Sequence, residues 1–222
     1  MRFGVISRNE AINARIYAAL EHIHPADVPK IVAKFRNTND TQRFHTFREL
    51  LVGAHLRANG LDARFERAVA GKTPDWTLLA EGNDPVELID VASIHQRNAL
   101  ESEMRRTVAA GQIWSGWPGI PPEHIYGKVD AKAGAYAELA ATVGVAYTIF
   151  LHGEFMSCLD ADDIKEVLLG DHGVFATRSH LSGVSFFTHS NGVDTYSYFE
   201  NSRGNRDSVA LQTLVRRGAY AA

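Results

Sequence analysis

The sequence is poor in three features that mark common protein classes: cysteine, long apolar runs and surplus positive charge. Its 222 residues include a single cysteine, Cys158, which excludes an internal disulfide and fits a reducing compartment. No apolar run approaches the roughly 18 residues needed to span a bilayer, and the N-terminus has no apolar signal segment. We therefore expect a cytoplasmic protein that does not enter a membrane.

Two familiar sequence motifs are also missing. The chain has no Gly-rich phosphate loop and no G-x-S-x-G elbow, so an enzyme acting on a small molecule ranks last among the functions considered. The formal charge of −3 means that any contact with nucleic acid must use a local basic patch. Hydrophobic residues make up 45% of the chain, which is enough for a sizeable core in one domain with additions.

Two acids lie at the ends of a predicted hairpin. Asp75 follows Pro74 at the start of one apolar run, Asp90 lies near the end of the next run, and residues 80–84 supply the turn. Neighbouring carboxylates stay ionised together only when a cation or a lysine lies between them. Mg²⁺ takes one or two protein carboxylates and leaves room for phosphate oxygens. The hairpin therefore suggests a metal site, while a turn-capping Asp75 and a solvated Asp90 remain the alternative.

A third acid lies inside the helix predicted for residues 41–59. Glu49 shares its face with Val52, Gly53 and Leu56, and the middle of this helix is apolar nearly all round. A carboxylate there is either desolvated, with a raised pKa, or paired. An arginine or His45, one turn earlier, is the alternative structural partner.

The remaining periodicity alternates between helices and strands. Further helices are predicted for residues 9–23, 28–36, 122–142 and 208–217, and further strands for residues 61–69, 145–151, 184–188 and 195–199. Residues 145–151 are the most apolar run, which favours a buried parallel strand after the helix at 122–142. Lys128, Lys132 and Tyr136 share one face of that helix.

Two other stretches are open to more than one interpretation. Trp114 and Trp117 lie in a predicted loop and could stack on bases, although tryptophans more often cover the edge of a core. Residues 160–163 read Asp-Ala-Asp-Asp, but the stretch lacks the central Gly and terminal Glu of a calcium loop. An acidic helix N-terminus is therefore favoured there.

In order, these elements resemble the core of the PD-(D/E)xK nuclease superfamily, the restriction-endonuclease-like fold. The resemblance covers roughly residues 41–152: a helix with an inward Glu, a strand, Pro-Asp at the next strand, an acid at the end of a third, then a helix and a buried strand. It implies an α/β domain with a central mixed sheet flanked by helices. Residues 1–40 would be an N-terminal helical extension, and residues 153–222 a C-terminal α+β addition, rich in β-structure, packed on the same domain.

One position departs from the family pattern, because Asp90-Val91-Ala92 has alanine where the family has its lysine. That lysine orients the attacking water and stabilises charge on the phosphate, so its loss would leave an inactive scaffold. Some members move the lysine to the following helix or carry Gln-x-x-x-Tyr there. Lys132 and Tyr136 have this spacing, which makes Lys132 the replacement candidate; a solvated lysine is the alternative.

The resemblance implies a Mg²⁺- or Mn²⁺-dependent deoxyribonuclease. The expected catalytic groups are Glu49, Asp75, Asp90 and Lys132, and the expected substrate contacts are Lys128, Tyr136 and Gln96. The metal ligands would be Asp75, Asp90 and the Val91 carbonyl, with Glu49 as a ligand at a second site or through a water molecule. DNA is the expected partner, and a homodimer is left open. Cations available to DNA are Lys128, Arg105, Arg106, Arg203 and Arg206. The alternative function is a catalytically inactive nuclease-fold protein that binds DNA or another protein.

Overall fold

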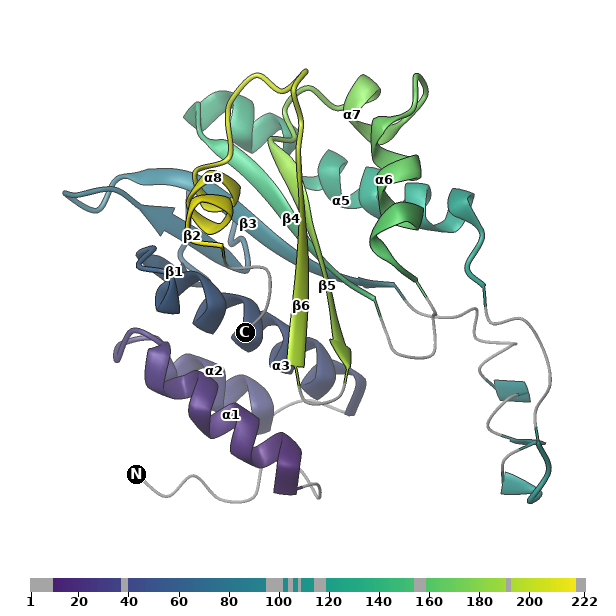
Figure 1. Cartoon of the computed structure of the whole chain (residues 1–222). Coiled ribbons are helices and arrows are strands. Elements are labelled where there is room, and N and C mark those ends of the chain that lie inside the picture. The colour runs from purple at the N-terminus through teal and green to yellow at the C-terminus, as the bar shows by residue number, and fades with distance from the viewer. Residues whose placement is uncertain are drawn as a thin grey trace.

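A six-stranded mixed sheet lies between two layers of helices (Figure 1). The computed structural model describes residues 10–36, 40–94, 102–103, 106–107, 109–113, 119–153, 159–190 and 193–218. The helices are α1 (Glu10–His22), α2 (Val28–Arg36), α3 (Asp40–Ala58), α5 (Pro122–Val143), α6 (Ala161–Leu169), α7 (Val174–Thr177) and α8 (Val209–Arg216). The strands are β1 (Ala63–Phe65), β2 (Trp76–Leu79), β3 (Pro85–Ile94), β4 (Ala146–Gly153), β5 (Gly183–Ser190) and β6 (Val193–Glu200). The predicted central mixed sheet flanked by helices is confirmed.

The strands lie in the sheet in the order in which they occur in the chain. β1, β2 and β3 form an antiparallel meander, β3, β4 and β5 are parallel, and β6 returns antiparallel to β5. Parallel neighbours need a crossover connection, and α5 lies between β3 and β4 in the chain as that rule requires. The predicted parallel strand after this helix is therefore confirmed as β4.

α1, α2, α3 and α8 cover one face of the sheet, and on this face Gly53 of α3 lies directly against Trp76 of β2. Trp76 of β2 is fully buried and donates a hydrogen bond from Nε1 to the Glu49 carbonyl at 2.8 Å. A Cβ at Gly53 would lie 1.9 Å from the Trp76 ring, so only glycine permits this approach. The contact fixes the Glu49 turn of α3 against the start of β2.

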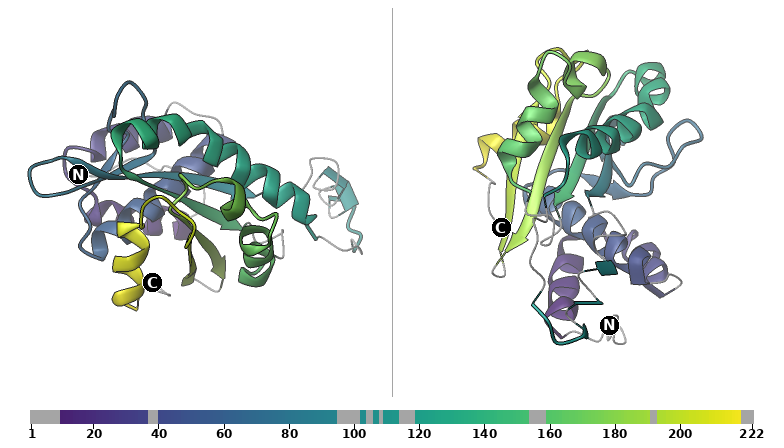
Figure 2. Two further views of the ribbon diagram at one scale, coloured as in Figure 1. Left: turned by 90° about the horizontal axis from the view of Figure 1, so that it is seen from above. Right: turned by 90° about the vertical axis from the view of Figure 1, so that its right-hand side faces the viewer.

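α5, α6 and α7 cover the opposite face, as the views in Figure 2 show. The buried side of α5 includes Val129 and Ala133, and the small side chain of Ala133 lets the helix lie close to Tyr147 and Ile149 of β4. This packing directs the Lys132 turn of α5 toward the middle of β3.

The C-terminal helix α8 is tied to the start of β3 by a buried carboxylate. Glu87 accepts hydrogen bonds from the Ser208 hydroxyl at 2.7 Å and from the Ala210 N–H at 2.8 Å. Burial raises the pKa of Glu87, and these donors, with Thr148, partly offset the effect. The first turn of α8 is therefore bound directly to the strand that carries Asp90.

Several sequence predictions can be compared with these elements. β1 is shorter than the predicted 61–69 strand because Glu66 has a left-handed backbone, with φ of 43°.

Asp160 caps α6 by accepting from the N–H groups of Asp162 and Asp163, which confirms the acidic helix N-terminus. In the part of the chain that the structure describes, no helix is both long and apolar enough to cross a membrane. The residues Gln96, Arg105, Trp114 and Trp117 lie outside the described residues.

Candidate active site

β3 continues past the start of β2, and the site forms where β2 begins. The β2–β3 pairing starts at Trp76 opposite Ile89, whereas β3 goes on to Ile94 beside β4. In continued register Val91 would face Pro74, which has no N–H to donate. The Val91 carbonyl therefore has no donor from Pro74 opposite it, while the Val91 N–H donates to the Asp75 carboxylate at 2.7 Å. Because the N–H and C=O of a strand residue point to the same side, the Val91 carbonyl faces this strand end too.

The three predicted acids approach this strand end from different sides. Ile89 and Val91 belong to the core beneath α3, so Asp90, which lies between them, faces the α5 layer. Glu49 comes from α3 on the opposite face, and Asp75 lies at the strand edge between the two. We call Glu49, Asp75 and Asp90 the acid cluster.

Glu49 is 1% exposed and has two basic neighbours. Lys34 Nζ of α2 lies 2.8 Å from Glu49 Oε2, and His45 Nε2, one helical turn away, lies 3.2 Å from Glu49 Oε1. Burial raises the pKa of Glu49 despite the lowering effects of Lys34 and of a hydrogen bond shared with Asp75. Glu49 is thus both desolvated and paired, the two conditions that its place in α3 predicts.

The pKa of Asp75 is strongly raised. Burial first, then the charges of Glu49 and Asp90, raise the pKa of Asp75 to about 7, and Lys132 with the Val91 N–H offsets part of the effect. Carboxylates this close titrate as a coupled set. An added cation would let the acids ionise together at neutral pH, which is how a metal ion alters the charge balance of its ligands.

His45 lies close to two of the acids, Glu49 and Asp75. Among the described residues, His45, Glu49 and Asp75 can each offer a donor atom such that all three atoms lie within 4.8 Å of one another. Burial, followed by the charges of Lys132, Lys34, Arg48 and Lys128, lowers the pKa of His45 to about 4. The imidazole is therefore neutral at pH 7, the form in which histidine binds metals.

Asp90 is bound to the α5 side of the site. Lys132 Nζ lies 3.3 Å from Asp90 Oδ2, so the contact expected from the sequence is present. The buried Tyr147 hydroxyl lies 3.2 Å from the same oxygen and 3.0 Å from the Lys132 carbonyl. Burial and the nearby Asp90 raise the pKa of Tyr147 well above its usual value, so this phenol stays neutral. The role of Lys132 in catalysis stays a prediction.

Tyr136 and Lys128, two further predicted substrate contacts, lie in α5. The Tyr136 hydroxyl donates to the Thr73 carbonyl at 3.0 Å and so holds the segment that leads to Asp75. Lys128 is exposed, one turn before Lys132 on α5. Both lie on the α5 side, next to the Asp90–Lys132 pair.

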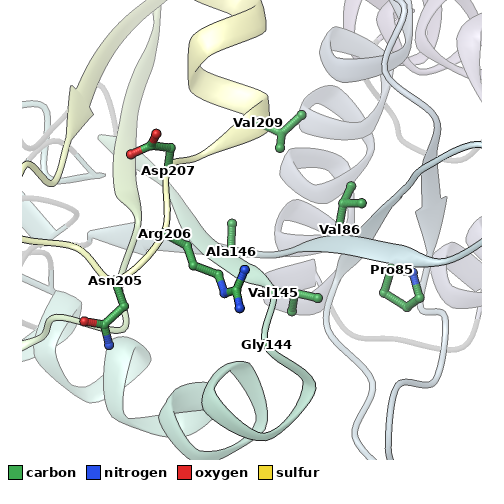
Figure 3. A pocket seen from close by; sticks show the side chains of 9 residues that line it. All are labelled: Pro85, Val86, Gly144, Val145, Ala146, Asn205, Arg206, Asp207 and Val209. Atoms are coloured by element: carbon green, nitrogen blue, oxygen red, sulfur yellow. The ribbon is translucent and has the colours of Figure 1, made fainter.

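Arg206 lies at the other end of β3. It lines a recess of about 420 Å³ with Pro85 and Val86, and its guanidinium reaches toward Gly144 at the end of α5 (Figure 3). Pro85 is five residues before Asp90, roughly 16 Å along a strand. The recess and Arg206 therefore do not belong to the acid cluster.

Sequence reasoning missed three residues of this site: His45 as a candidate metal ligand, Lys34 and Tyr147. The i, i+4 spacing of His45 and Glu49 was a usable signal, since it places both on one face of α3. Lys34 and Tyr147 gave no such signal because their contacts join separate elements. Comparison of the chain with known protein families, curated proteins and solved structures finds no match.

Proposed function

We propose that the chain is a metal-dependent nuclease with a restriction-endonuclease-like core, which hydrolyses phosphodiester bonds of DNA. The observation that carries the proposal is the convergence of the acid cluster with His45 and Lys132 at the start of β2. This arrangement places an ammonium group beside carboxylates that are candidate metal ligands. Phosphoryl transfer uses both a metal ion and a fixed positive charge.

The order of the elements supports the proposed core. α3, the β1–β2–β3 meander, α5 and the parallel strand β4 follow one another in the order on which the resemblance rests. Glu49 lies in the helix, Asp75 directly before the second strand and Asp90 in the third strand of that series.

The proposed metal ligands are His45, Glu49 and Asp75, with the Val91 carbonyl beside them and Asp90 across the strand end. Carboxylates suit Mg²⁺ and Mn²⁺, whereas imidazole favours transition metals, so this set should prefer Mn²⁺ to Mg²⁺. A bound divalent cation would lower the pKa of a water molecule and draw charge from a phosphoryl oxygen.

The chain's own residues have separate roles in this proposal. Asp75, oriented by the Val91 N–H, holds its carboxylate at the strand end. The ammonium of Lys132 offsets negative charge that develops on the phosphate oxygens. A water oxygen bonds to phosphorus and gives up one proton to solvent, while the bond to the leaving sugar oxygen breaks and that oxygen takes up a proton from solvent.

The charge around His45 supports a polyanionic substrate. Lys34, Arg48, Lys128 and Lys132 all act on this imidazole, although the chain as a whole carries a charge of −3. Lys34 is held between Glu49 and Glu66, and Arg48 is buried. Lys128 and Lys132 are therefore the cations of this group that phosphates would meet, and binding should weaken as salt concentration rises.

The alternative is a catalytically inactive nuclease-fold protein that binds DNA or a protein partner. One observation favours it: Ala92 occupies the position of the family lysine. On this interpretation the contact between Lys132 and Asp90 is a structural ion pair. The two functions differ in whether DNA that binds is also cut.

A cleavage assay with a matched variant tests the proposal. Plasmid DNA, linear duplex, single strands and RNA are incubated with Mn²⁺, Mg²⁺ or EDTA. We expect metal-dependent cleavage of DNA, its loss in Asp75→Asn and its retention in Asp84→Asn, which changes an exposed acid in the same hairpin. Salt-sensitive DNA binding without cleavage under any metal condition would support the inactive alternative.

A further inference from the structure

A lysine from the N-terminal helices lies between two acids of the site. Lys34 Nζ is 2.8 Å from Glu49 Oε2 and 2.7 Å from Glu66 Oε1. The side chain of Lys34 is 24% exposed, whereas that of Glu49 is 1% exposed. The ammonium therefore joins a buried carboxylate to one at the surface.

The surroundings of Lys34 hold its ammonium in place and charged. Nζ lies 5.2 Å from the centre of the Phe65 ring, on its face, and the neighbouring α2 residues Ile31 and Phe35 are buried. Burial acts against the charged form of Lys34, but Glu49 and Glu66 together outweigh it, so the pKa of Lys34 is raised. This is a fixed positive charge rather than a side chain free in solvent.

Glu66 is positioned by an unusual backbone conformation. Its φ of 43° is uncommon for a residue other than glycine, and such conformations cluster at functional sites. The Glu66 N–H donates to the Asp75 carbonyl at 3.0 Å, so this residue belongs to the same strand end as the acid cluster. Its carboxylate thereby faces Lys34.

The two oxygens of Glu49 are divided between different partners. Oε1 faces His45 at 3.2 Å, and His45 is one of the three residues whose donor atoms lie close enough together to share an ion. Oε2 faces Lys34. An ion bound by His45 and Asp75 can therefore use Oε1 without displacing the lysine.

We propose that the ammonium of Lys34 fills a second cation position, between Glu49 and Glu66, so that the site takes a single divalent ion. The inference rests on the proposed function and specifies the metal content of the same site. Lys34 is a positioning residue here: it neutralises Glu49 and leaves one face of that carboxylate for the ion. Without it, Glu49 and Glu66 would present facing carboxylate oxygens, which are ligands for Mn²⁺ or Mg²⁺.

Calorimetric titration with Mn²⁺ tests this assignment. Wild type should bind one ion per chain, and Lys34→Gln should bind two, because the pair of carboxylates is released. The double variant Lys34→Gln/Glu66→Gln should return to one ion. Lys30→Gln is the matched control, since Lys30 lies one turn earlier on α2 and is 53% exposed; it should behave as wild type.

Each outcome separates this inference from the proposed function. One ion in wild type and one in folded Lys34→Gln, with equal affinity, would overturn the role of Lys34 and leave the metal site standing. Two ions in wild type would overturn it even where Lys34→Gln lost its fold, a state that circular dichroism would detect. A wild type that binds no Mn²⁺ would overturn the proposed function itself.

Discussion

The carboxylate of Asp75 accepts a hydrogen bond from the backbone N–H of Val91 at 2.7 Å, at the point where Pro74 ends the β2–β3 ladder. Proline removes the backbone donor that would face the Val91 carbonyl, and the aspartate that follows supplies a side-chain acceptor for the Val91 N–H. Pro74-Asp75 therefore ends the strand pairing and places an acid beside β3 in one step.

The first prediction concerns the stability that a metal ion adds. Mn²⁺ should raise the melting temperature of wild type, because only the folded state binds the ion. A free ion concentration of about 100 times Kd adds about 2.7 kcal/mol to the free energy of unfolding. Asp75→Asn should abolish the shift, and Asp84→Asn should keep it. Equal shifts in wild type and Asp75→Asn, measured by thermal denaturation, would remove Asp75 from the site.

The second prediction concerns the choice of metal. His45→Ala should weaken Mn²⁺ binding by about tenfold or more, since even outer-sphere partners of a metal contribute that much. Its effect on Mg²⁺ should be smaller, because Mg²⁺ prefers oxygen ligands. Titration of both ions measures the difference, with His22→Ala, an exposed histidine at the end of α1, as control. Equal losses for the two metals would argue against imidazole as a ligand.

The third prediction concerns the contact between α3 and β2. Gly53→Ala forces a methyl group into the Trp76 ring and should lower the free energy of unfolding by about 1–3 kcal/mol, the usual cost of overpacking. Gly134→Ala, in α5 with nothing within 4 Å of the added carbon, should instead be stabilising because alanine favours helix. Urea denaturation compares them. A neutral Gly53→Ala would mean that α3 can move away from β2.

The fourth prediction concerns pH. His55 stacks on Tyr196 at 3.8 Å between ring centres, and burial lowers its pKa from 6.5 to about 4, with a small opposing effect of Asp194. Between these pH values the unfolded chain binds more protons than the folded one, so stability falls as pH decreases from about 6.5 to about 4. The full difference is on the order of 3 kcal/mol.

His55→Phe provides the control for this pH effect because it keeps an aromatic ring against Tyr196 and removes the titration. It also removes the hydrogen bond between His55 Nε2 and the Tyr198 hydroxyl. The free energy of unfolding of wild type minus that of His55→Phe should decrease over the same pH range. Subtraction cancels the contributions of Glu49, Asp75 and Glu87, whose raised pKa values act in the opposite direction. A difference that stays constant with pH would show that His55 titrates alike in the folded and unfolded chains.

The sequence predicted the elements whose signals are local. Apolar periodicity marked α5, and a β-branched apolar run marked β4; both lie close to their predicted bounds. Asp75, Asp90 and Lys132 could be brought together from the sequence because a hairpin and an α/β connection each have one usual geometry.

Other features depend on contacts that no local pattern records. Lys34 reaches Glu49 across two helices, and Glu87 binds Ser208 across 121 positions. The short β1 follows from the left-handed backbone of Glu66, a residue with no intrinsic preference for it. Alternation along β3 does explain the predicted contact of Lys132: Asp90 shares the α5 face with Ala92, so a lysine from α5 reaches the Asp90 carboxylate.

DNA cleavage by Lys132→Ala in Mn²⁺ tests the central claim most directly. Lys132 should stabilise charge on the phosphate, so its loss should lower the cleavage rate by a factor on the order of 10² or more, with the fold retained. Lys128→Ala, one turn away on the exposed part of α5, should weaken DNA binding but keep cleavage. A Lys132→Ala protein that cuts DNA at the wild-type rate, or a wild type that binds Mn²⁺ and DNA without cutting, would contradict the account.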